Sequence, residues 1–148
     1  MSDSIVVVFK GRKTRITVKD WPSRYANLRV QSEGDRKLQV VGFANWDYDQ
    51  VVGRLTLHVD KTLLITDYWL ADSLLKRDRP RVLTTLVACA EEIAIEMSSQ
   101  RRGTGYLEWQ LDRRKLEFVE ALFRDFEPCE RSWRLRRRGM KYLRKRCA

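Results

Sequence analysis

The basic side chains of this chain gather at its C-terminal end, where they form the largest set of groups able to bind another molecule. Residues 131–148 contain nine Lys and Arg residues and no Asp or Glu. The whole chain has 30 basic and 20 acidic residues, so the first 130 residues hold 30 − 9 = 21 basic and 20 acidic ones. Ammonium and guanidinium groups bind phosphates and carboxylates. The residues expected to contact such an anionic partner are Arg134, Arg136, Arg137, Arg138, Lys141, Arg144, Lys145 and Arg146.

Two interpretations of this basic C-terminal segment remain open. Trp133 and Tyr142 stand among the arginines, and a mixture of aromatic and basic residues is typical of surfaces that bind single-stranded nucleic acid. Alternatively, Trp133 anchors an edge strand to the core while the arginines face water. We expect the partner to be a nucleic acid or an acidic protein surface rather than a membrane. No helix-turn-helix, zinc-finger or RNA-recognition signature accompanies the segment, which argues against sequence-specific DNA reading.

Candidates for acid–base or metal chemistry are few. His58 is the only histidine, and no nucleophile motif accompanies it, so we expect it to face solvent or complete a hydrogen bond. Asp47 and Asp49 flank Tyr48, but the glycine and the late glutamate of a calcium loop are missing. We expect these carboxylates to lie at the tip of a polar hairpin, and we expect no metal site.

The cysteines favour a reduced protein. Cys89, Cys129 and Cys147 are odd in number and far apart in sequence, which predicts neither a disulfide framework nor a metal knuckle. Cys89 falls on an apolar stripe and is expected in the core, whereas Cys147 is expected to be exposed. The chain has no secretory signal and no apolar run long enough to cross a bilayer, so we expect a cytoplasmic protein.

The first half of the chain has the patterns of β-strands. Predicted strands cover residues 5–9, 14–18, 37–44, 50–59 and 62–70, and a short helix is predicted over residues 24–30. Residues 32–35 read as a turn, and residues 45–49 as a hairpin loop of about five residues.

The second half changes to helical spacing. Apolar residues recur every three or four positions after Pro80, which predicts a long helix over about 80–101, capped by Asp78 and stopped by Gly103. A strand is expected over 105–111, a second helix over about 113–126, and strands over 132–138 and 140–146. The fold class is therefore α+β, or mixed α/β, in a single domain of residues 1–148 whose last part is the basic segment 131–148.

This order of elements resembles the GNAT superfamily of N-acetyltransferases. The likeness in order covers residues 37–146, and the local likeness lies in residues 104–138. There a strand, Tyr106-Leu107-Glu108-Trp109, leads to a helix ending Ala121-Leu122-Phe123-Arg124-Asp125-Phe126-Glu127-Pro128. The resemblance implies a central mixed sheet, V-shaped, that binds acetyl-CoA where two central strands splay apart.

The family motifs are altered in this sequence. The family binds the cofactor pyrophosphate with a glycine-containing loop ahead of the long helix, because the backbone must approach the phosphates closely. The matching stretch here, Leu75-Lys76-Arg77-Asp78-Arg79-Pro80-Arg81-Val82, has no glycine, and Pro80 removes one N–H donor. The tyrosine that often serves the family as general acid falls near Ala121, which cannot transfer a proton.

Three functions follow from this combination. The leading hypothesis is a GNAT-like binding module that uses no cofactor and engages a nucleic acid or an acidic host protein through its basic C-terminus, as an effector encoded by a phage or mobile element would. The alternative is an acetyl-CoA-dependent N-acetyltransferase whose divergent pyrophosphate loop uses Arg77, Arg79, Arg81 and Val82. The third is a nucleic-acid-binding protein with an unrelated α+β fold.

Overall fold

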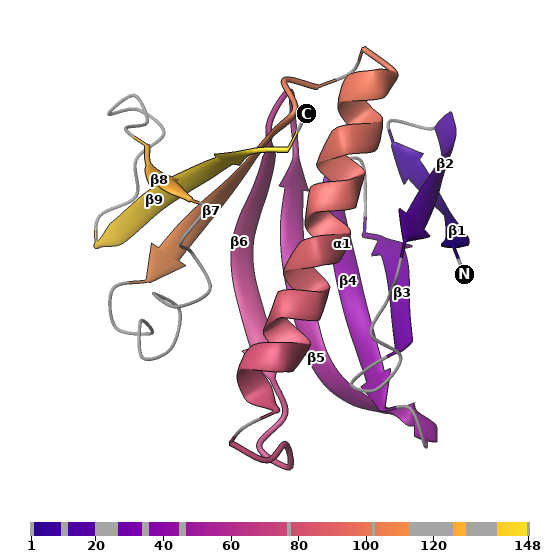
Figure 1. The fold of residues 1–148 in the computed structure, drawn as a ribbon, viewed down its shortest axis with the longest axis vertical. Coiled ribbons are helices and arrows are strands. Elements are labelled where there is room, and N and C mark those ends of the chain that lie inside the picture. The colour runs from indigo at the N-terminus through magenta and orange to yellow at the C-terminus, as the bar shows by residue number, and fades with distance from the viewer. Residues whose placement is uncertain are drawn as a thin grey trace.

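The structure is a computed structural model in which a long helix lies against one face of a twisted sheet (Figure 1). It describes residues 2–9, 12–19, 27–33, 36–44, 47–76, 78–101, 103–112, 126–129 and 139–147. The main sheet has seven strands in the order β3-β4-β5-β6-β7-β9-β8. Their bounds are Asn27–Ser32 (β3), Lys37–Ala44 (β4), Asp47–Val59 (β5), Leu63–Leu70 (β6), Tyr106–Asp112 (β7), Glu127–Pro128 (β8) and Met140–Arg146 (β9). All neighbours are antiparallel except β6 and β7, so the predicted mixed α+β sheet is confirmed.

Strands β4 to β6 form the antiparallel meander that the strand patterns predicted, and β3 extends it at one edge. The predicted strand 37–44 coincides with β4, and the prediction for 62–70 begins one residue before β6. Strand β5 begins at Asp47 rather than at residue 50, and Asp47 pairs with Ala44. The expected five-residue loop was therefore wrong, because Asp47 and Asp49 extend the hairpin instead of forming its tip.

The helix predicted over residues 24–30 was also wrong for residues 27–30, the part of it that the structure describes. Residues 27–30 belong to β3, where Val30 pairs with Val40 and Leu28 pairs with Gly42. Pairing with β4 and partial burial of Leu28 and Val30 against the core outweigh the weak local helical preference.

A separate hairpin precedes the main sheet. Strands β1, Ser2–Phe9, and β2, Arg12–Lys19, pair antiparallel along their whole length, which confirms the strands predicted over 5–9 and 14–18. This two-stranded sheet lies beside the main sheet, where β1 contacts β3 and β2 contacts the long helix (Figure 1).

The long helix, α1, spans Arg79–Ser99 and connects β6 to β7. Its predicted apolar stripe is buried. The stripe consists of Val82, Leu86, Cys89, Ala90, Ile93 and Met97. Together with apolar residues of β4, β5, β6 and β7, this stripe forms one continuous core between the helix and the sheet.

The ends of α1 differ from the prediction. Asp78 occupies the N-cap position, but its side chain makes no capping hydrogen bond. The helix ends two residues before the predicted boundary, and Arg101, not a glycine, takes the left-handed conformation with φ 57°. Gly103 serves packing instead, because a Cβ there would lie 3.1 Å from the Lys61 carbonyl oxygen.

The last part of the chain is described only in pieces. The helix predicted over about 113–126 and the strand predicted over 132–138 lie outside the described residues, apart from Phe126, which is buried. Strand β8 follows Phe126 directly. Gly139 has a positive φ of 78° and leads into β9, which confirms the strand predicted over 140–146.

Close contact between α1 and β5 depends on Gly53. A Cβ at this position would lie 3.1 Å from both Leu86 Cδ1 and Val82 Cγ1, and 3.2 Å from Leu70 Cδ2. The Gly53→Ala variant should therefore lose about 1–3 kcal/mol of unfolding free energy through overpacking, measured by urea denaturation. Thr84→Ala, on the exposed side of the same helix, should change it by less than about 0.5 kcal/mol. Equal stability of the two variants would contradict this account of the contact.

Candidate functional site

The main sheet splits between its two parallel strands. Strands β6 and β7 pair at only three positions: Leu63 with Leu107, Leu64 with Glu108, and Ile65 with Trp109. Beyond these pairs, β6 continues to Leu70 and β7 to Asp112, and the two strands diverge (Figure 1). Among the described residues, the edges of β6 and β7 that face each other there have no strand partner. We call this gap the β6/β7 cleft.

A bulge in β6 lies where the divergence begins. Thr56 of β5 pairs with Asp67 and Leu57 pairs with Ile65, so Thr66 has no opposite residue in β5. A bulge bends its strand and increases the local twist. The Thr66 hydroxyl also donates to the Thr56 carbonyl oxygen at 3.4 Å. The bulge therefore turns β6 away from β7 immediately after their last shared pair.

Aromatic side chains support the closed end of the cleft. Trp109 lies at the last β6–β7 pair and is completely buried. Its ring meets Tyr68 edge-on at 6.0 Å between centroids, and Phe126 edge-on at 6.4 Å. Edge-to-face contacts at these distances are favourable. The three rings pack where the strands begin to separate and hold β6, β7 and the chain before β8 together.

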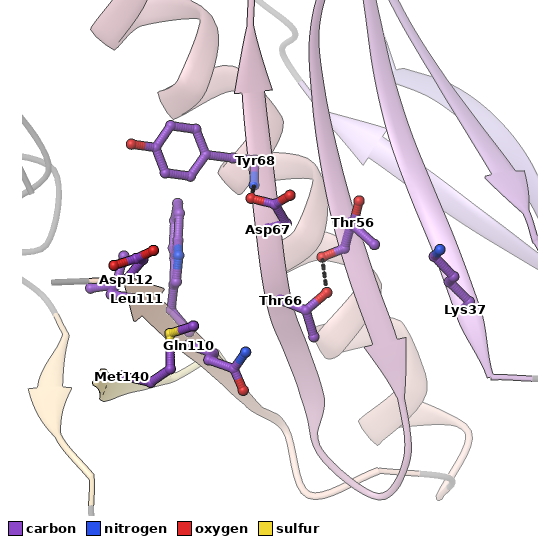
Figure 2. A pocket seen from close by; sticks show the side chains of 10 residues that line it. Lys37, Thr56, Thr66, Asp67, Tyr68, Gln110, Leu111, Asp112 and Met140 are labelled. Atoms are coloured by element: carbon purple, nitrogen blue, oxygen red, sulfur yellow. Dashed lines mark hydrogen bonds between the residues drawn. The ribbon is translucent and has the colours of Figure 1, made fainter. Parts of the chain in front are cut away.

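The cleft contains a cavity of about 440 Å³. Figure 2 shows side chains of β4, β5 and β6 on one side of it, and those of β7 and β9 on the other. Most of the lining side chains are polar. The lining residues are Lys37, Thr56, Thr66, Asp67, Tyr68, Trp109, Gln110, Leu111, Asp112 and Met140.

Two of the polar groups in the cavity wall are held by hydrogen bonds. The Tyr68 backbone N–H donates to Asp67 Oδ1 at 2.9 Å, which fixes the direction of that carboxylate. Across β7 and β9, the Tyr142 hydroxyl donates to Gln110 Oε1 at 2.9 Å, and both side chains are buried. The cavity thus has a positioned proton acceptor on one wall and a buried amide on the other.

The N-terminus of α1 has few N–H groups for an anion. The Arg79 N–H is directed at the Leu75 carbonyl oxygen at 3.2 Å, and Pro80 has no N–H. The preceding loop turns inward as well, since Leu74 N–H donates to Ala71 O and Asp78 N–H to Leu75 O. A helix start normally binds phosphate through such free N–H groups. Here the N–H groups of Leu74, Asp78 and Arg79 bond to carbonyl oxygens of the loop itself.

The residues predicted from the family resemblance occupy different environments around this helix start. Arg79 donates from Nη1 to the Ala71 carbonyl oxygen at 2.8 Å, so it ties down its own loop. Arg81 is exposed, while the Val82 side chain is buried and its N–H bonds to Asp78 O. Arg77 lies outside the described residues. Cofactor binding by these four residues stays a prediction.

The basic residues of β9 point to both sides of the sheet. Arg144 pairs with Glu108 and Arg146 with Tyr106, so these side chains share one face, where Arg144 stacks over the Tyr106 ring at 5.0 Å. Lys145 lies on the opposite face and forms an ion pair with Glu91 of α1 at 3.0 Å. Lys141 shares that face by alternation and is exposed. Arg134, Arg136, Arg137 and Arg138 lie outside the described residues.

Other candidates from the sequence play no visible part in the cleft. His58 is exposed, which agrees with the expectation that it faces solvent. Cys89 is buried, and burial raises the pKa of its thiol. Cys147 is half-buried rather than exposed, because its backbone pairs with Gly105 and it packs against the core; burial raises the pKa of its thiol to about 11.

Two kinds of feature are missing from the described part of the chain. It contains no group of three or more His, Cys, Asp or Glu side chains placed to hold a metal ion. Nor does it contain a helix with the length and apolarity needed to span a membrane.

The sequence did not point to the residues of the cavity. Thr56, Thr66 and Gln110 belong to no motif, and each lies within an ordinary strand pattern. The single available signal is the break in alternation at Thr66-Asp67, since Thr66 follows three successive buried residues of β6. That break coincides with the bulge.

Comparison with known proteins gives the fold. No protein-family model matches the chain, and no curated protein sequence matches it. Among solved structures, a putative acyl-CoA N-acyltransferase from Klebsiella pneumoniae superposes with a TM-score of 0.56 at 8% identity, over 78% of this chain and 75% of that one. A Bacillus subtilis acetyltransferase in complex with CoA gives 0.53 at 13% identity, over 82% and 98%. The PaiA N-acetyltransferase of Thermoplasma acidophilum, in complex with coenzyme A, gives 0.51 at 14% identity, over 75% of this chain.

These similarities define the class of fold. Many similar solved structures are GNAT acetyltransferases, and the chain has a GNAT-like fold. The third alternative, an unrelated α+β fold, was therefore wrong. The chain spans 61% of the length of the Thermoplasma structure. At identities of 8–14%, the likeness concerns the fold alone.

Because Arg79 bonds to its own loop, its loss should affect stability. Arg79→Ala removes a charged donor from the Ala71 carbonyl oxygen and should lower the free energy of unfolding by about 1–2 kcal/mol. Lys76→Ala, which changes an exposed side chain of the same loop, should lower it by less than about 0.5 kcal/mol. Thermal and urea unfolding of both variants measure the difference. If Arg79→Ala unfolds like the parent chain, Arg79 does not stabilise this loop.

Proposed function

We propose that the β6/β7 cleft binds the acyl-pantetheine arm of an acyl-CoA and that the protein transfers the acyl group to an amine. The observation that carries this proposal is the parallel β6–β7 pairing, which stops after three pairs and opens into a cavity of about 440 Å³. The GNAT-like fold supports the same function, since the similar structures from B. subtilis and T. acidophilum are described with CoA bound.

The walls of the cleft suit an extended arm with amide groups. The facing edges of β6 and β7 have no strand partner among the described residues, so a chain inserted there would run along two strand edges. Buried backbone groups require partners. A pantetheine chain, whose amides both donate and accept, can pair with such strand edges as an added strand would. Leu111 and Met140 add apolar surface for its methylene groups.

The phosphate end of an acyl-CoA has a poorer fit. The usual donors at the helix start are used within the loop or replaced by Pro80. Positive charge near this point comes from side chains instead, and Lys76 and Arg81 are both exposed. Charge without directed N–H donors gives weak, salt-sensitive contacts. We therefore expect the pantetheine arm to contribute most of the binding free energy of an acyl-CoA, and the nucleotide to contribute little.

An acceptor amine must lose a proton when it is acylated. When bound, the acyl-CoA would supply the acyl group as a thioester: the amine nitrogen would bond to the acyl carbon, the carbon–sulfur bond would break, and the CoA sulfur would leave as a thiolate that takes up a proton. Asp67 and Asp112 both line the cavity and are the carboxylates there that can accept a proton from the amine. Asp67 is the better positioned of the two because the Tyr68 N–H fixes its orientation. Ala121, at the family's usual acid position, has no part in this scheme.

Binding is tested first, by isothermal titration with three ligands at moderate salt. Acetyl-CoA and acetyl-pantetheine should bind with dissociation constants within about ten-fold of each other, because the nucleotide contributes little. 3′-Phospho-ADP, which lacks the arm, should not bind measurably. Met140→Trp, which fills the cavity, should abolish the heat of acetyl-CoA binding in a protein whose melting temperature is checked in parallel. Absence of heat with all three ligands would overturn the proposal.

A second candidate function is binding of an anionic partner through β9. It is favoured by a cavity of about 330 Å³ lined by Tyr106, Glu127, Arg144, Lys145 and Arg146. Nucleic acid and an acidic protein surface both fit a site with the basic side chains of Arg144 and Arg146. This function needs no acyl donor.

The second candidate predicts a difference between the two sides of β9. A variant with Arg144→Ala and Arg146→Ala should elute from immobilised heparin at clearly lower salt than the parent chain. The matched control carries Lys141→Ala and Lys61→Ala, which remove the same charge from exposed sites elsewhere. Equal elution of the two variants would mean that net charge alone, not this site, determines retention.

A further inference from the structure

The sheet face turned away from α1 carries a row of basic and aromatic residues across four strands. Pairing places Arg29 of β3 opposite Val41 of β4, Val41 opposite Arg54 of β5, and Arg54 opposite Trp69 of β6. Directly paired residues share one face of a sheet. The next row, which contains Gly42, Gly53 and Leu70, faces α1, as the contacts of Gly53 show. The row from Arg29 to Trp69 therefore belongs to the opposite face, which we call the open face.

The guanidinium of each arginine of this row lies over an aromatic ring. The Arg54 guanidinium carbon lies 5.1 Å from the centroid of the Trp69 ring, and that of Arg29 lies 5.2 Å from the centroid of Phe43. Stacking of this kind is favourable and leaves the N–H groups at the edge of the guanidinium directed outward. The two arginines are two strands apart, a separation of about 10 Å. Each offers a fork of donors of the type that binds phosphate.

These groups are accessible to a partner. Trp69 is 45% exposed and is, with Leu75, one of the two exposed large hydrophobic side chains among the described residues. Arg29 and Arg54 are exposed as well. No described carboxylate lies within ion-pair distance of either arginine. Lys37 and His58 extend the same face; Lys37 forms an ion pair with Glu33 at 3.6 Å, and Asp67 lies in the row next to Arg54 and Trp69.

We propose that the open face of β3–β6 binds single-stranded nucleic acid, with a base stacked on Trp69 and phosphates held by Arg54 and Arg29. An exposed indole beside a stacked guanidinium suits an unpaired base and its phosphate. An acidic peptide would use the charges but would bring no base to stack on the part of the Trp69 ring that remains exposed beside Arg54. This surface is distinct from the β9 cavity, and the proposal does not depend on acyl transfer.

The open face also adjoins the β6/β7 cleft. Thr56 and Asp67 form the row next to Arg54 and Trp69, and both line the cleft cavity together with Lys37 of the same face. A strand bound across the open face would therefore pass beside the mouth of the cavity.

The test is fluorescence anisotropy of a labelled, single-stranded 15-nucleotide oligo(dT) or oligo(U) titrated with the full chain at low and physiological salt. Trp69→Ala and Arg54→Ala should each weaken binding by about ten-fold, and Trp69→Phe should restore most of the affinity lost in Trp69→Ala. Lys61→Ala removes one exposed positive charge from a turn and should weaken binding by less than about three-fold. The corresponding duplex should bind less tightly, because its bases are already stacked.

Controls separate this surface from folding defects and from the cleft. Circular dichroism should show each variant folded. Titration of Trp69→Ala with acetyl-CoA should give the same heat of binding as titration of the parent chain, including the case in which neither protein binds acetyl-CoA. If Trp69→Ala and Lys61→Ala weaken binding equally, the surface attracts polyanions by charge alone and the proposal is overturned. Full competition by poly-glutamate at equal charge concentration would likewise assign the face to acidic proteins.

Discussion

The three-pair contact between the parallel strands β6 and β7 is the constraint on which the rest of the structure depends. A parallel pair needs a crossover, and α1 supplies it while covering one face of the sheet. The bulge at Thr66 and the buried ring of Trp109 end the pairing, so the same connection that closes the core also opens the cleft. Removing the bulge would extend the β6–β7 ladder and eliminate the cavity.

At the start of α1, hydrogen bonds within the preceding loop order the chain and occupy N–H groups that could bind phosphate. Pro80 and the inward hydrogen bonds of residues 71–79 remove the N–H donors that a helix start offers to phosphate. Arg79 satisfies a loop carbonyl that would otherwise need another donor. The loop is thus stabilised by groups that could have bound a ligand, and only side-chain charge remains for an anion. Under the proposed function, binding of an acyl-CoA would depend more on the cleft than on the phosphates of the ligand.

Strand alternation distributes the charges of the protein. In β9 it sends Lys145 to Glu91 on α1 and Arg144 to the opposite face, so the basic residues of this strand do not share one face of the sheet. In the meander the same rule collects Arg29, Arg54 and Trp69, which are far apart in sequence, on one face. The proposed nucleic-acid surface is therefore a property of register rather than of local composition.

The sequence by itself determined the strands β4 and β6 and the body of α1, because apolar periodicity reports which side of each element is buried. The mixed sheet followed from the resemblance of the order of elements to the GNAT superfamily. It also indicated the weakened phosphate loop, since the absence of glycine and the presence of Pro80 are local facts. Tertiary structure alone decided that residues 27–30 form a strand, that Asp47 extends a hairpin, and that Thr66, Asp67, Tyr68 and Gln110 meet around one cavity. Those outcomes depend on pairing between distant segments, and a bulge of one residue, which shifts every later side chain, leaves almost no mark on the local pattern.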